Sequence, residues 1–244
     1  MELEGIIFDV DGVIVETENI HRLAYNTMFE KMGIDVEWSP SDYAVRLVEV
    51  GGKKLQPIVE QLAVRDKAAH MKRLHEVKKR CYEELVDKLG TEGKLAPRPG
   101  VIRLIQEALQ NNVKLGLATA SPREGASRLL RYVLGEVLLD QFSALCTGYD
   151  VKRTKPAPDI YIFATEQLGT AAARTVAIED TQHGLESAKS AGLACVVTPS
   201  EYTVGGRFEA ADLVVPDLDH FNKEKPVDLV VLEGLLNATG TMSS

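Results

Sequence analysis

Short apolar runs that alternate with stretches of helical periodicity are the feature that most restricts how this chain can fold. The runs that predict buried strands are IIF at 6–8, KLGLATAS at 114–121, SALCT at 143–147, TVAIED at 175–180, ACVVT at 194–198 and DLVV at 212–215. Helices are predicted over 101–110, 123–133, 158–168 and 181–190. Because the runs are apolar throughout, both faces of the sheet must be covered. The predicted fold class is therefore α/β, with a parallel sheet and helices on both faces.

The residues between the first run and the others have a different pattern. They predict a helix over 18–32 and several helices, without a clear strand, over about 41–92. The segment KLAPRPG at 94–100 then interrupts the pattern with two prolines and a glycine. We therefore predict a core domain formed by residues 1–17 and 94–244, with a helical cap domain of residues 18–93 inserted after the first strand.

The composition is that of a globular protein and limits the classes of partner. The 244 residues are 45% hydrophobic and 26% charged, with a net charge of −8 and a pI near 5.3. This balance disfavours nucleic acid, and no apolar run approaches the roughly 20 residues of a membrane span. MELEG leads almost directly into the first strand and leaves no room for a signal peptide. We expect a monomer in the cytoplasm, or in the plastid stroma if a transit peptide has been removed.

The chain has three cysteines, Cys81, Cys146 and Cys195. Their spacing fits neither a disulfide framework nor a zinc site. We expect them to be reduced and packed in the interior, as in a protein of a reducing compartment.

Polar residues directly follow three of the predicted strands. In an open parallel sheet the ligand site lies outside the carboxyl ends of the strands. The residues at these ends are Asp9, Asp11, Thr119, Glu179 and Asp180. Lys155 is expected to join them from the loop RTKPAPD, which its two prolines stiffen.

Four carboxylates gathered at one end of a sheet would repel one another unless a cation met them. Ligands that offer only oxygen, in an incomplete cage, suit Mg²⁺. In this interpretation Asp9 attacks phosphorus to give an aspartyl phosphate, while Asp11 offers its backbone carbonyl to the metal and its side chain as the acid and base. Lys155, Thr119 and nearby backbone N–H groups balance the charge of the transferring phosphoryl group.

Each of these residues also has a purely structural explanation. Two aspartates after a strand are a weak signal by themselves, and Thr119 could cap a strand or helix. Lys155 could be a solvated loop residue, and Glu179 and Asp180 could favour the positive end of the following helix. Their joint occurrence at strand ends, in this order, favours the chemical interpretation.

Four segments carry a resemblance to a known family. DVDGV, LATAS, KPAP and IEDTQHG resemble, in the usual order, the motifs of the haloacid dehalogenase-like phosphohydrolases, and the resemblance covers residues 6–199. It implies a Rossmann-like core with an inserted helical cap, Asp9 as nucleophile and Asp11 as acid and base. It also implies Mg²⁺ held by Asp9, the Asp11 carbonyl and Asp180, with Glu179 completing the metal group. Val13 departs from the family pattern, because phosphatases often have threonine there.

The cap is expected to choose the substrate, since the core recognises little beyond phosphate. TENIHR at 17–22 and YAVRLVEVGGKK at 43–54 resemble the CbbY-type branch of the family, which is similar to xylulose-1,5-bisphosphate phosphatases. The substrate-binding positions that this resemblance implies are Glu18, His21, Arg46, Gly51, Gly52 and Lys53, with Thr119 and Ala120 from the core. The positive charges of Arg46 and Lys53 suit a second phosphate. Gly51 and Gly52 would let the backbone approach that phosphate.

The match in the cap is imperfect and leaves alternatives open. Val48, Glu49 and Val50 stand where relatives tend to have threonine or glycine, and Glu49 adds a negative charge near an anionic ligand. His21 could instead be a helix residue at the boundary of the cap. Arg46 and Lys53 could instead be solvated side chains.

Three functions are compatible with these features. The leading one is a Mg²⁺-dependent phosphatase acting on a small sugar phosphate, xylulose 1,5-bisphosphate or a related sugar bisphosphate. A mutase resembling β-phosphoglucomutase is the alternative, because the spacing of Thr17 and His21 and the same motifs occur there. The third is a catalytically silent phosphate-binding module on the same fold, which the intact Asp9 and Asp11 disfavour.

Overall fold

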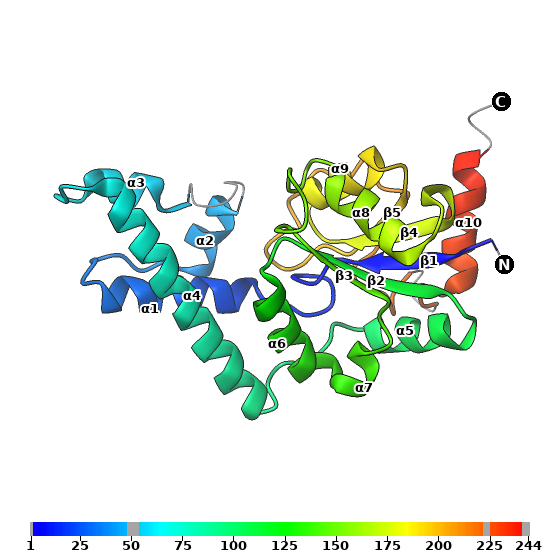
Figure 1. Cartoon of the computed structure of the whole chain (residues 1–244), viewed down its shortest axis with the longest axis horizontal. Helices are drawn as coiled ribbons and strands as arrows, with labels where there is room; N and C mark the ends of the chain where they lie inside the picture. The colour runs from blue at the N-terminus through cyan, green and yellow to red at the C-terminus, as the bar shows by residue number, and fades with distance from the viewer. Residues whose placement is uncertain (1, 48–53, 222–224, 241–244) are drawn as a thin grey trace. The chain divides into compact units, whose positions relative to one another are not determined.

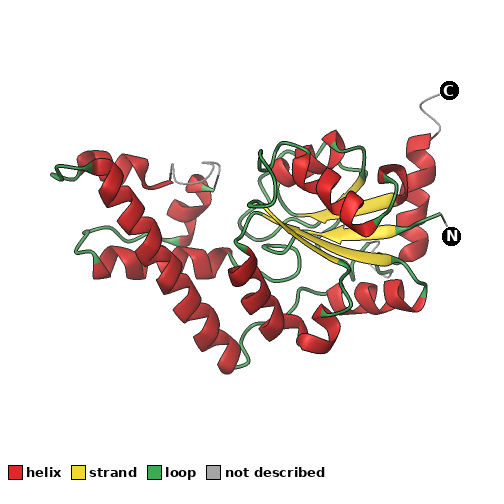
Figure 2. Cartoon of the chain, in the orientation of Figure 1, coloured by secondary structure: helices red, strands yellow, loops and turns green. Residues whose placement is uncertain are grey.

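The computed structural model describes residues 2–47, 54–221 and 225–240. The chain forms two compact units, one of Met1–Glu16 with Leu95–Ser244 and the other of Thr17–Lys94. The first unit contains a sheet covered by helices, and the second is helical (Figures 1 and 2).

The borders of the helical unit differ by one residue from the predicted ones. Thr17 was predicted to belong to the core, but it is the N-cap residue of the first helix of the helical unit. Lys94 was also placed in the core, but its N–H donates to the carbonyl of Leu89 in the last turn of that unit's long helix, at 2.8 Å. Local backbone hydrogen bonds therefore hold both residues in the helical unit.

Six parallel strands form one sheet in the order β3-β2-β1-β4-β5-β6. The strands are β1 (Gly5–Phe8), β2 (Lys114–Thr119), β3 (Ala144–Thr147), β4 (Thr175–Glu179), β5 (Ala194–Val197) and β6 (Leu213–Val214). All six correspond to predicted runs, so the predicted parallel sheet is confirmed. β1 lies at the centre because the chain crosses first to one side, through β2 and β3, and then to the other.

Helices cover both faces of this sheet (Figure 2). On one face lie α8 (Asp159–Leu168) and α9 (Gln182–Ser190), and on the other lie α5 (Val101–Gln110), α6 (Arg123–Leu134) and α10 (Leu229–Gly240). Ile7 of β1 belongs to the buried cluster under α8 and α9, whereas the neighbouring Phe8 packs edge-on against Phe142. Successive residues of the strand thus point to opposite faces, which explains why the whole run is apolar.

Among the described residues of the core, the helices α7 and α10 and one 3-10 turn were not predicted. α7 (Glu136–Leu139) is a single turn, too short for a periodic pattern, and a 3-10 turn at Ala172–Arg174 is shorter still. α10 begins in the apolar run LVVLEGLL at 229–236. Apart from Glu233 and Gly234 this segment is apolar, and periodicity alone cannot distinguish a helix from a buried strand in such a short apolar segment.

The helical unit contains α1 (Glu18–Lys31), α2 (Pro40–Arg46), α3 (Gln56–Gln61) and α4 (Lys67–Thr91). α1 packs along α4, and an aromatic cluster connects α1 to α2. Trp38 lies at the centre of this cluster, with ring centroids 4.9 Å from both Tyr25 and Phe29. α2 starts at a capping box in which the Ser39 hydroxyl and the Asp42 carboxylate accept each other's backbone N–H groups. Local capping and aromatic packing therefore define this unit.

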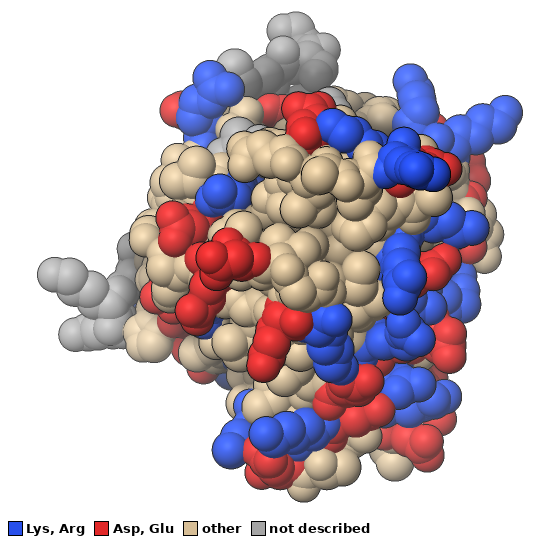
Figure 3. Space-filling view, turned by 90° about the vertical axis from the view of Figure 1, so that its left-hand side faces the viewer, with Lys and Arg blue, Asp and Glu red and all other residues tan. Residues whose placement is uncertain are grey.

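On one face of the molecule, basic and acidic side chains of the described residues lie close together (Figure 3). Examples in the helical unit are the pairs Lys31–Glu84 and Lys79–Glu83. This is the pattern of solvated helix surfaces.

The cysteines and the apolarity of the helices were also predicted from the sequence. Cys81, Cys146 and Cys195 are free thiols and buried, as expected. Among the described helices, none is both long enough and apolar enough to cross a bilayer.

Candidate active site

Asp9 is the first residue beyond β1 and the centre of a polar cluster at the carboxyl ends of the strands. Phe8 pairs with Leu117 of β2 and Ile178 of β4, so Asp9 lies level with Ala118 and Glu179. Its N–H continues the ladder by donating to the Ile178 carbonyl at 2.9 Å. The side chain is buried, with 7% of the residue exposed. The sheet therefore fixes the backbone of Asp9, whose side-chain carboxylate has little contact with water.

Lys155 is the cation that meets this carboxylate. Its ammonium donates to Asp9 Oδ1 at 2.5 Å, to Glu179 Oε1 at 2.7 Å and to the Ala118 carbonyl at 2.9 Å. An ammonium has three hydrogens, so these contacts use all of its donors. The side chain is 10% exposed. Lys155 thus joins the strand-end residues, as expected from the sequence, where it is a buried bridge between two acids and not a solvated loop residue.

Glu179 ends β4 and is surrounded by donors. Its Oε1 accepts from Lys155 and from the Tyr161 hydroxyl, at 2.7 and 2.5 Å. Its Oε2 accepts from the backbone N–H of Asp180 at 3.2 Å and from the Thr181 hydroxyl at 3.4 Å. The carboxylate also lies against Gly184 of α9, where a Cβ would occupy the same space. Burial of this acid is possible because its oxygens are hydrogen-bonded.

The carboxylates of Asp9, Glu179 and Asp180 form a group that fits a metal ion. All three are buried, and one oxygen from each lies within 4.8 Å of the others. A Cβ on Gly12, where φ is +80°, would fall onto the Asp180 carboxylate, so only glycine leaves room for it. An all-oxygen donor set with more negative charge than Lys155 neutralises suits a hard cation such as Mg²⁺.

The protonation of these groups depends on the same balance of charge. Burial raises the pKa of Asp9 well above its usual range; the Lys155 ammonium opposes this shift, and the Glu179 carboxylate adds to it. Burial lowers the pKa of Lys155, but the two carboxylates outweigh burial and raise it above its ordinary value. Lys155 therefore stays charged, and further positive charge at the carboxylate group would favour the ionised form of Asp9.

Asp11 lies beside the end of β2 instead of joining the three carboxylates. Its Oδ2 accepts from the Ser121 hydroxyl at 2.9 Å and from the Thr119 hydroxyl at 3.3 Å. Thr119 in turn accepts from the N–H of Ser121 at 3.0 Å. The predicted pair Asp11 and Thr119 is thus brought together, with Ala120 between Thr119 and Ser121. Ser121 was not predicted, although its place in LATAS could have suggested it.

Arg98 is a second residue that sequence reasoning missed. Its guanidinium donates to the carbonyl of Gly12 in the turn after Asp11, and to the Thr198 and Pro199 carbonyls at 2.7 and 3.0 Å. It also reaches the Pro216 carbonyl at 3.2 Å. A single side chain thus ties together three loops at the carboxyl ends of the strands. The sequence signal was an arginine between two prolines, which indicated only a break.

The helical unit holds the predicted substrate residues that precede residue 48. Glu18 Oε2 accepts from the Tyr43 hydroxyl at 2.8 Å. Arg46 lies with its guanidinium carbon 4.9 Å from the centroid of the Trp38 ring and donates to the Asp42 carbonyl at 2.7 Å. Gly51, Gly52 and Lys53, with Val48, Glu49 and Val50, lie outside the described residues.

His21 of α1 faces α4. Its Nδ1 lies 2.8 Å from the Lys78 ammonium, and its ring stacks on Tyr82 with centroids 4.3 Å apart. Because an ammonium can only donate, Nδ1 accepts and the ring proton is on Nε2. Lys78 was not singled out from the sequence, because lysines on a charged helix are usually solvated.

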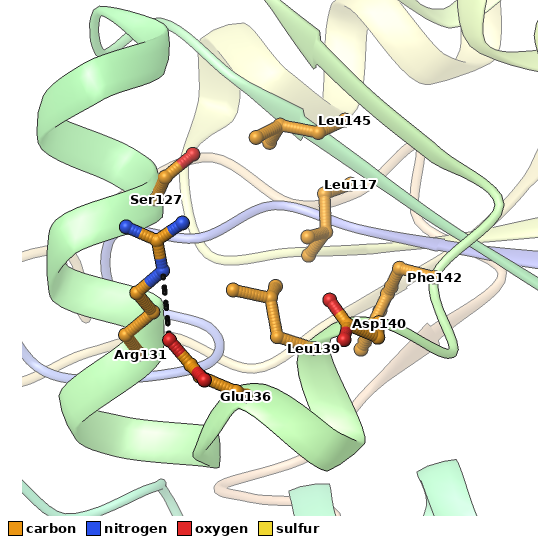
Figure 4. Close-up of a pocket in the computed structure, with 8 residues that line it drawn as sticks. All are labelled: Leu117, Ser127, Arg131, Glu136, Leu139, Asp140, Phe142 and Leu145. Atoms are coloured by element: carbon orange, nitrogen blue, oxygen red, sulfur yellow. Dashed lines mark ion pairs between the residues drawn. The ribbon is translucent and has the colours of Figure 1, made fainter.

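A separate pocket of about 430 Å³ lies between β2 and the helices α6 and α7 (Figure 4). Leu117, Leu139, Phe142 and Leu145 line it together with polar side chains, including the pair Arg131–Glu136. None of the residues of the carboxylate group lines it. It therefore has no part in the site described above.

The fold and the site together define a class of hydrolase. The family model described as haloacid dehalogenase-like hydrolase matches residues 3–192, and the chain belongs to this family. Protein CbbY of Rhodobacter capsulatus is 39% identical over 219 residues, which cover 89% of this chain and 95% of that protein. The predicted family and fold class are confirmed.

The chain is also similar to a solved structure of a CbbY variant and to a β-phosphoglucomutase. A variant of CbbY from Rhodobacter sphaeroides, crystallised with xylulose 1,5-bisphosphate, has a TM-score of 0.80 and 32% identity, and the match covers 94% of this chain and 99% of that one. β-Phosphoglucomutase of Bacillus subtilis is 32% identical over 216 residues, 87% of this chain and 89% of that protein.

The carboxylate group predicts a stabilising effect of Mg²⁺. Because a ligand that binds only the native state stabilises it, Mg²⁺ at 100 times its Kd should raise the free energy of unfolding by about 2.7 kcal/mol. Thermal unfolding with Mg²⁺ and after EDTA measures this. In Asp180→Asn, Mg²⁺ should raise the unfolding temperature much less than in the wild type. In Asp140→Asn, a matched change at an exposed residue, the increase caused by Mg²⁺ should be the same as in the wild type. An equal shift in all three proteins would place the metal elsewhere.

Proposed function

We propose that the chain is a phosphatase that hydrolyses a small phosphorylated sugar through an aspartyl-phosphate intermediate. The observation that carries the proposal is the Asp9 carboxylate held by Lys155 beside two further buried carboxylates at the carboxyl ends of the strands. A nucleophile, a cation and a metal-binding group in one place are what phosphoryl transfer needs.

The first half of the reaction uses Asp9. An oxygen of its carboxylate attacks phosphorus, and the bond from phosphorus to the sugar oxygen breaks. Lys155 orients Asp9 through its contact with Oδ1, at 2.5 Å, and offers positive charge to the phosphoryl oxygens. Mg²⁺ bound by Asp9, Asp180, the Asp11 carbonyl and Glu179 would supply the rest of the charge neutralisation.

Asp11 acts in both halves of the reaction, first as an acid and then as a base. Its protonated carboxyl gives a proton to the departing sugar oxygen, and the resulting carboxylate then takes a proton from the water that attacks the aspartyl phosphate. Inorganic phosphate leaves, and both acids return to their starting states. The hydroxyls of Thr119 and Ser121 keep the Asp11 side chain near the end of β2.

A sugar bisphosphate is the proposed substrate, with xylulose 1,5-bisphosphate the first candidate. A variant of the CbbY relative from Rhodobacter sphaeroides was crystallised with that compound. In this chain we assign the second phosphate to Arg46 and Lys53, and we assign Glu18 and His21 to substrate binding as well. The proposed product is a sugar monophosphate with free phosphate.

The competing function is a sugar-phosphate mutase, which the relative from Bacillus subtilis favours. A mutase returns the phosphoryl group to a sugar, whereas a phosphatase lets water take it. The two share Asp9 and Asp11 and differ in the fate of the phospho-enzyme. Only the product distinguishes them.

The test is to measure free phosphate and isomer formation from the same substrates. We expect Mg²⁺-dependent phosphate release from xylulose 1,5-bisphosphate, slower release from matched sugar monophosphates, and no isomer. Asp9→Asn should abolish release, because an amide is a poor nucleophile and a weaker metal ligand. Isomer formation without phosphate would establish the mutase. No turnover of any phosphate ester would support a silent binding module.

Asp11→Asn should separate acid–base chemistry from metal binding. The change keeps the backbone carbonyl but removes general acid–base catalysis, so turnover of sugar phosphates should fall about 10²–10⁴-fold. Activated aryl phosphates, whose leaving groups need no proton, should lose much less in the step that forms the aspartyl phosphate. Burst kinetics with both substrate types measure this step. Equal losses would assign Asp11 a structural role.

Arg46→Ala should reveal whether the cap binds a second phosphate. Loss of one charge-assisted hydrogen bond costs about 1.5–3 kcal/mol, so kcat/KM for the bisphosphate should fall by roughly one to two orders of magnitude. A matched monophosphate should be almost unaffected. Arg73→Ala, at an exposed position of α4, is the control. Equal proportional losses on both substrates would show that Arg46 supports the cap and does not bind phosphate.

A further inference from the structure

Tyr161 is a buried polar group that the reaction described above does not use. It belongs to the first turn of α8, and its side chain is fully buried in the cluster between α8, α9 and the sheet. Other members of that cluster include Ile160, Ala164 and Cys195. A phenylalanine would fill the same space, so the hydroxyl calls for a separate explanation.

The hydroxyl of Tyr161 is directed at the carboxylate group. It donates to Glu179 Oε1 at 2.5 Å, and this oxygen also accepts from Lys155 at 2.7 Å. The Lys155 ammonium lies 5.1 Å from the centroid of the Tyr161 ring, on its face. The Tyr161 side chain therefore contacts both members of the buried ion pair, Glu179 and Lys155.

Lys155 divides its donors between two acids, Glu179 and Asp9, and Tyr161 influences this division. With the hydroxyl present, Glu179 Oε1 has a second donor and Lys155 can also bind Asp9 at 2.5 Å. Without it, Lys155 would be the remaining donor to that oxygen among the described residues. The ammonium would then be drawn toward Glu179 and away from Asp9, because a buried carboxylate oxygen must be hydrogen-bonded.

We propose that Tyr161 is a positioning residue: its hydroxyl holds Glu179 so that Lys155 remains shared with Asp9, which keeps the three carboxylates in the arrangement that binds Mg²⁺ and presents the nucleophile. This inference rests on the proposed function for the role of the metal. Groups that hydrogen-bond metal ligands commonly change metal affinity or activity by about 10–100-fold when they are removed.

The test compares Tyr161→Phe with Thr165→Val. Thr165 lies one turn further along α8, is buried, and donates to the Ile162 carbonyl at 2.8 Å, so its loss removes a hydroxyl from the same helix without touching the site. Mg²⁺ affinity is measured by titration calorimetry and needs no substrate. Tyr161→Phe should raise the Kd for Mg²⁺ about 10-fold or more. Thr165→Val should leave it within about twofold of the wild type.

A kinetic measurement adds a second readout. If Tyr161 acts through the geometry of Asp9 and Lys155, Tyr161→Phe at saturating Mg²⁺ should lower kcat about 10-fold and leave KM for the sugar phosphate nearly unchanged, because small misplacements of reacting groups reduce the rate of the chemical step. If Tyr161 only stabilised the fold, its substitution would lower the unfolding temperature without lowering kcat at unchanged KM.

The outcomes separate this inference from the proposed function. Unchanged Mg²⁺ affinity in Tyr161→Phe, with a wild type that binds Mg²⁺, would refute the role of Tyr161 alone. Equal losses of affinity in Tyr161→Phe and Thr165→Val would also refute it, since any loss of a hydroxyl from α8 would then have the same effect. A wild type without Mg²⁺ affinity would refute the metal site and this role together.

Discussion

The buried ammonium of Lys155 is the interaction on which the rest of the core site depends. Two carboxylates of adjacent strands, Asp9 and Glu179, could not be buried side by side without a cation between them. Lys155 comes from a loop far along the chain, so the site is complete only when the sheet has brought these segments together. The single positive charge does not balance the three carboxylates of the group, and this excess of negative charge is what makes the site suitable for a metal ion.

The close packing of this site limits which residues can surround it. Glycine is needed at Gly12 and Gly184, because a Cβ at either position would meet the Asp180 or Glu179 carboxylate. Arg98 satisfies carbonyls of three neighbouring loops, including that of Gly12. These residues take no part in the chemistry, but they fix the backbone around the acids. Preorganisation of this kind lets charged groups act without rearranging during the reaction.

The two units divide the work in the proposed function. The core supplies the groups that any phosphate ester needs, and the helical unit supplies the residues that could distinguish one sugar from another. Within the helical unit, polar side chains pair across helices: Glu18 with Tyr43, and His21 with Lys78. These pairs fix the donors and acceptors that the unit can offer to a substrate. Members of the same family that differ in substrate would be expected to differ in this unit first.

The sequence by itself determined the six strands, the inserted helical block and the order of Asp9, Thr119, Lys155 and Glu179 along the chain, because buried parallel strands require continuous apolar runs and place the following residues at one edge. It did not reveal α10, whose apolar run is ambiguous, or the partners Tyr161, Ser121, Arg98 and Lys78. Tyrosine, serine and lysine are common residue types with many structural roles. Which oxygen each of them meets depends on the distance between segments far apart in the chain, and only the tertiary structure decides that distance.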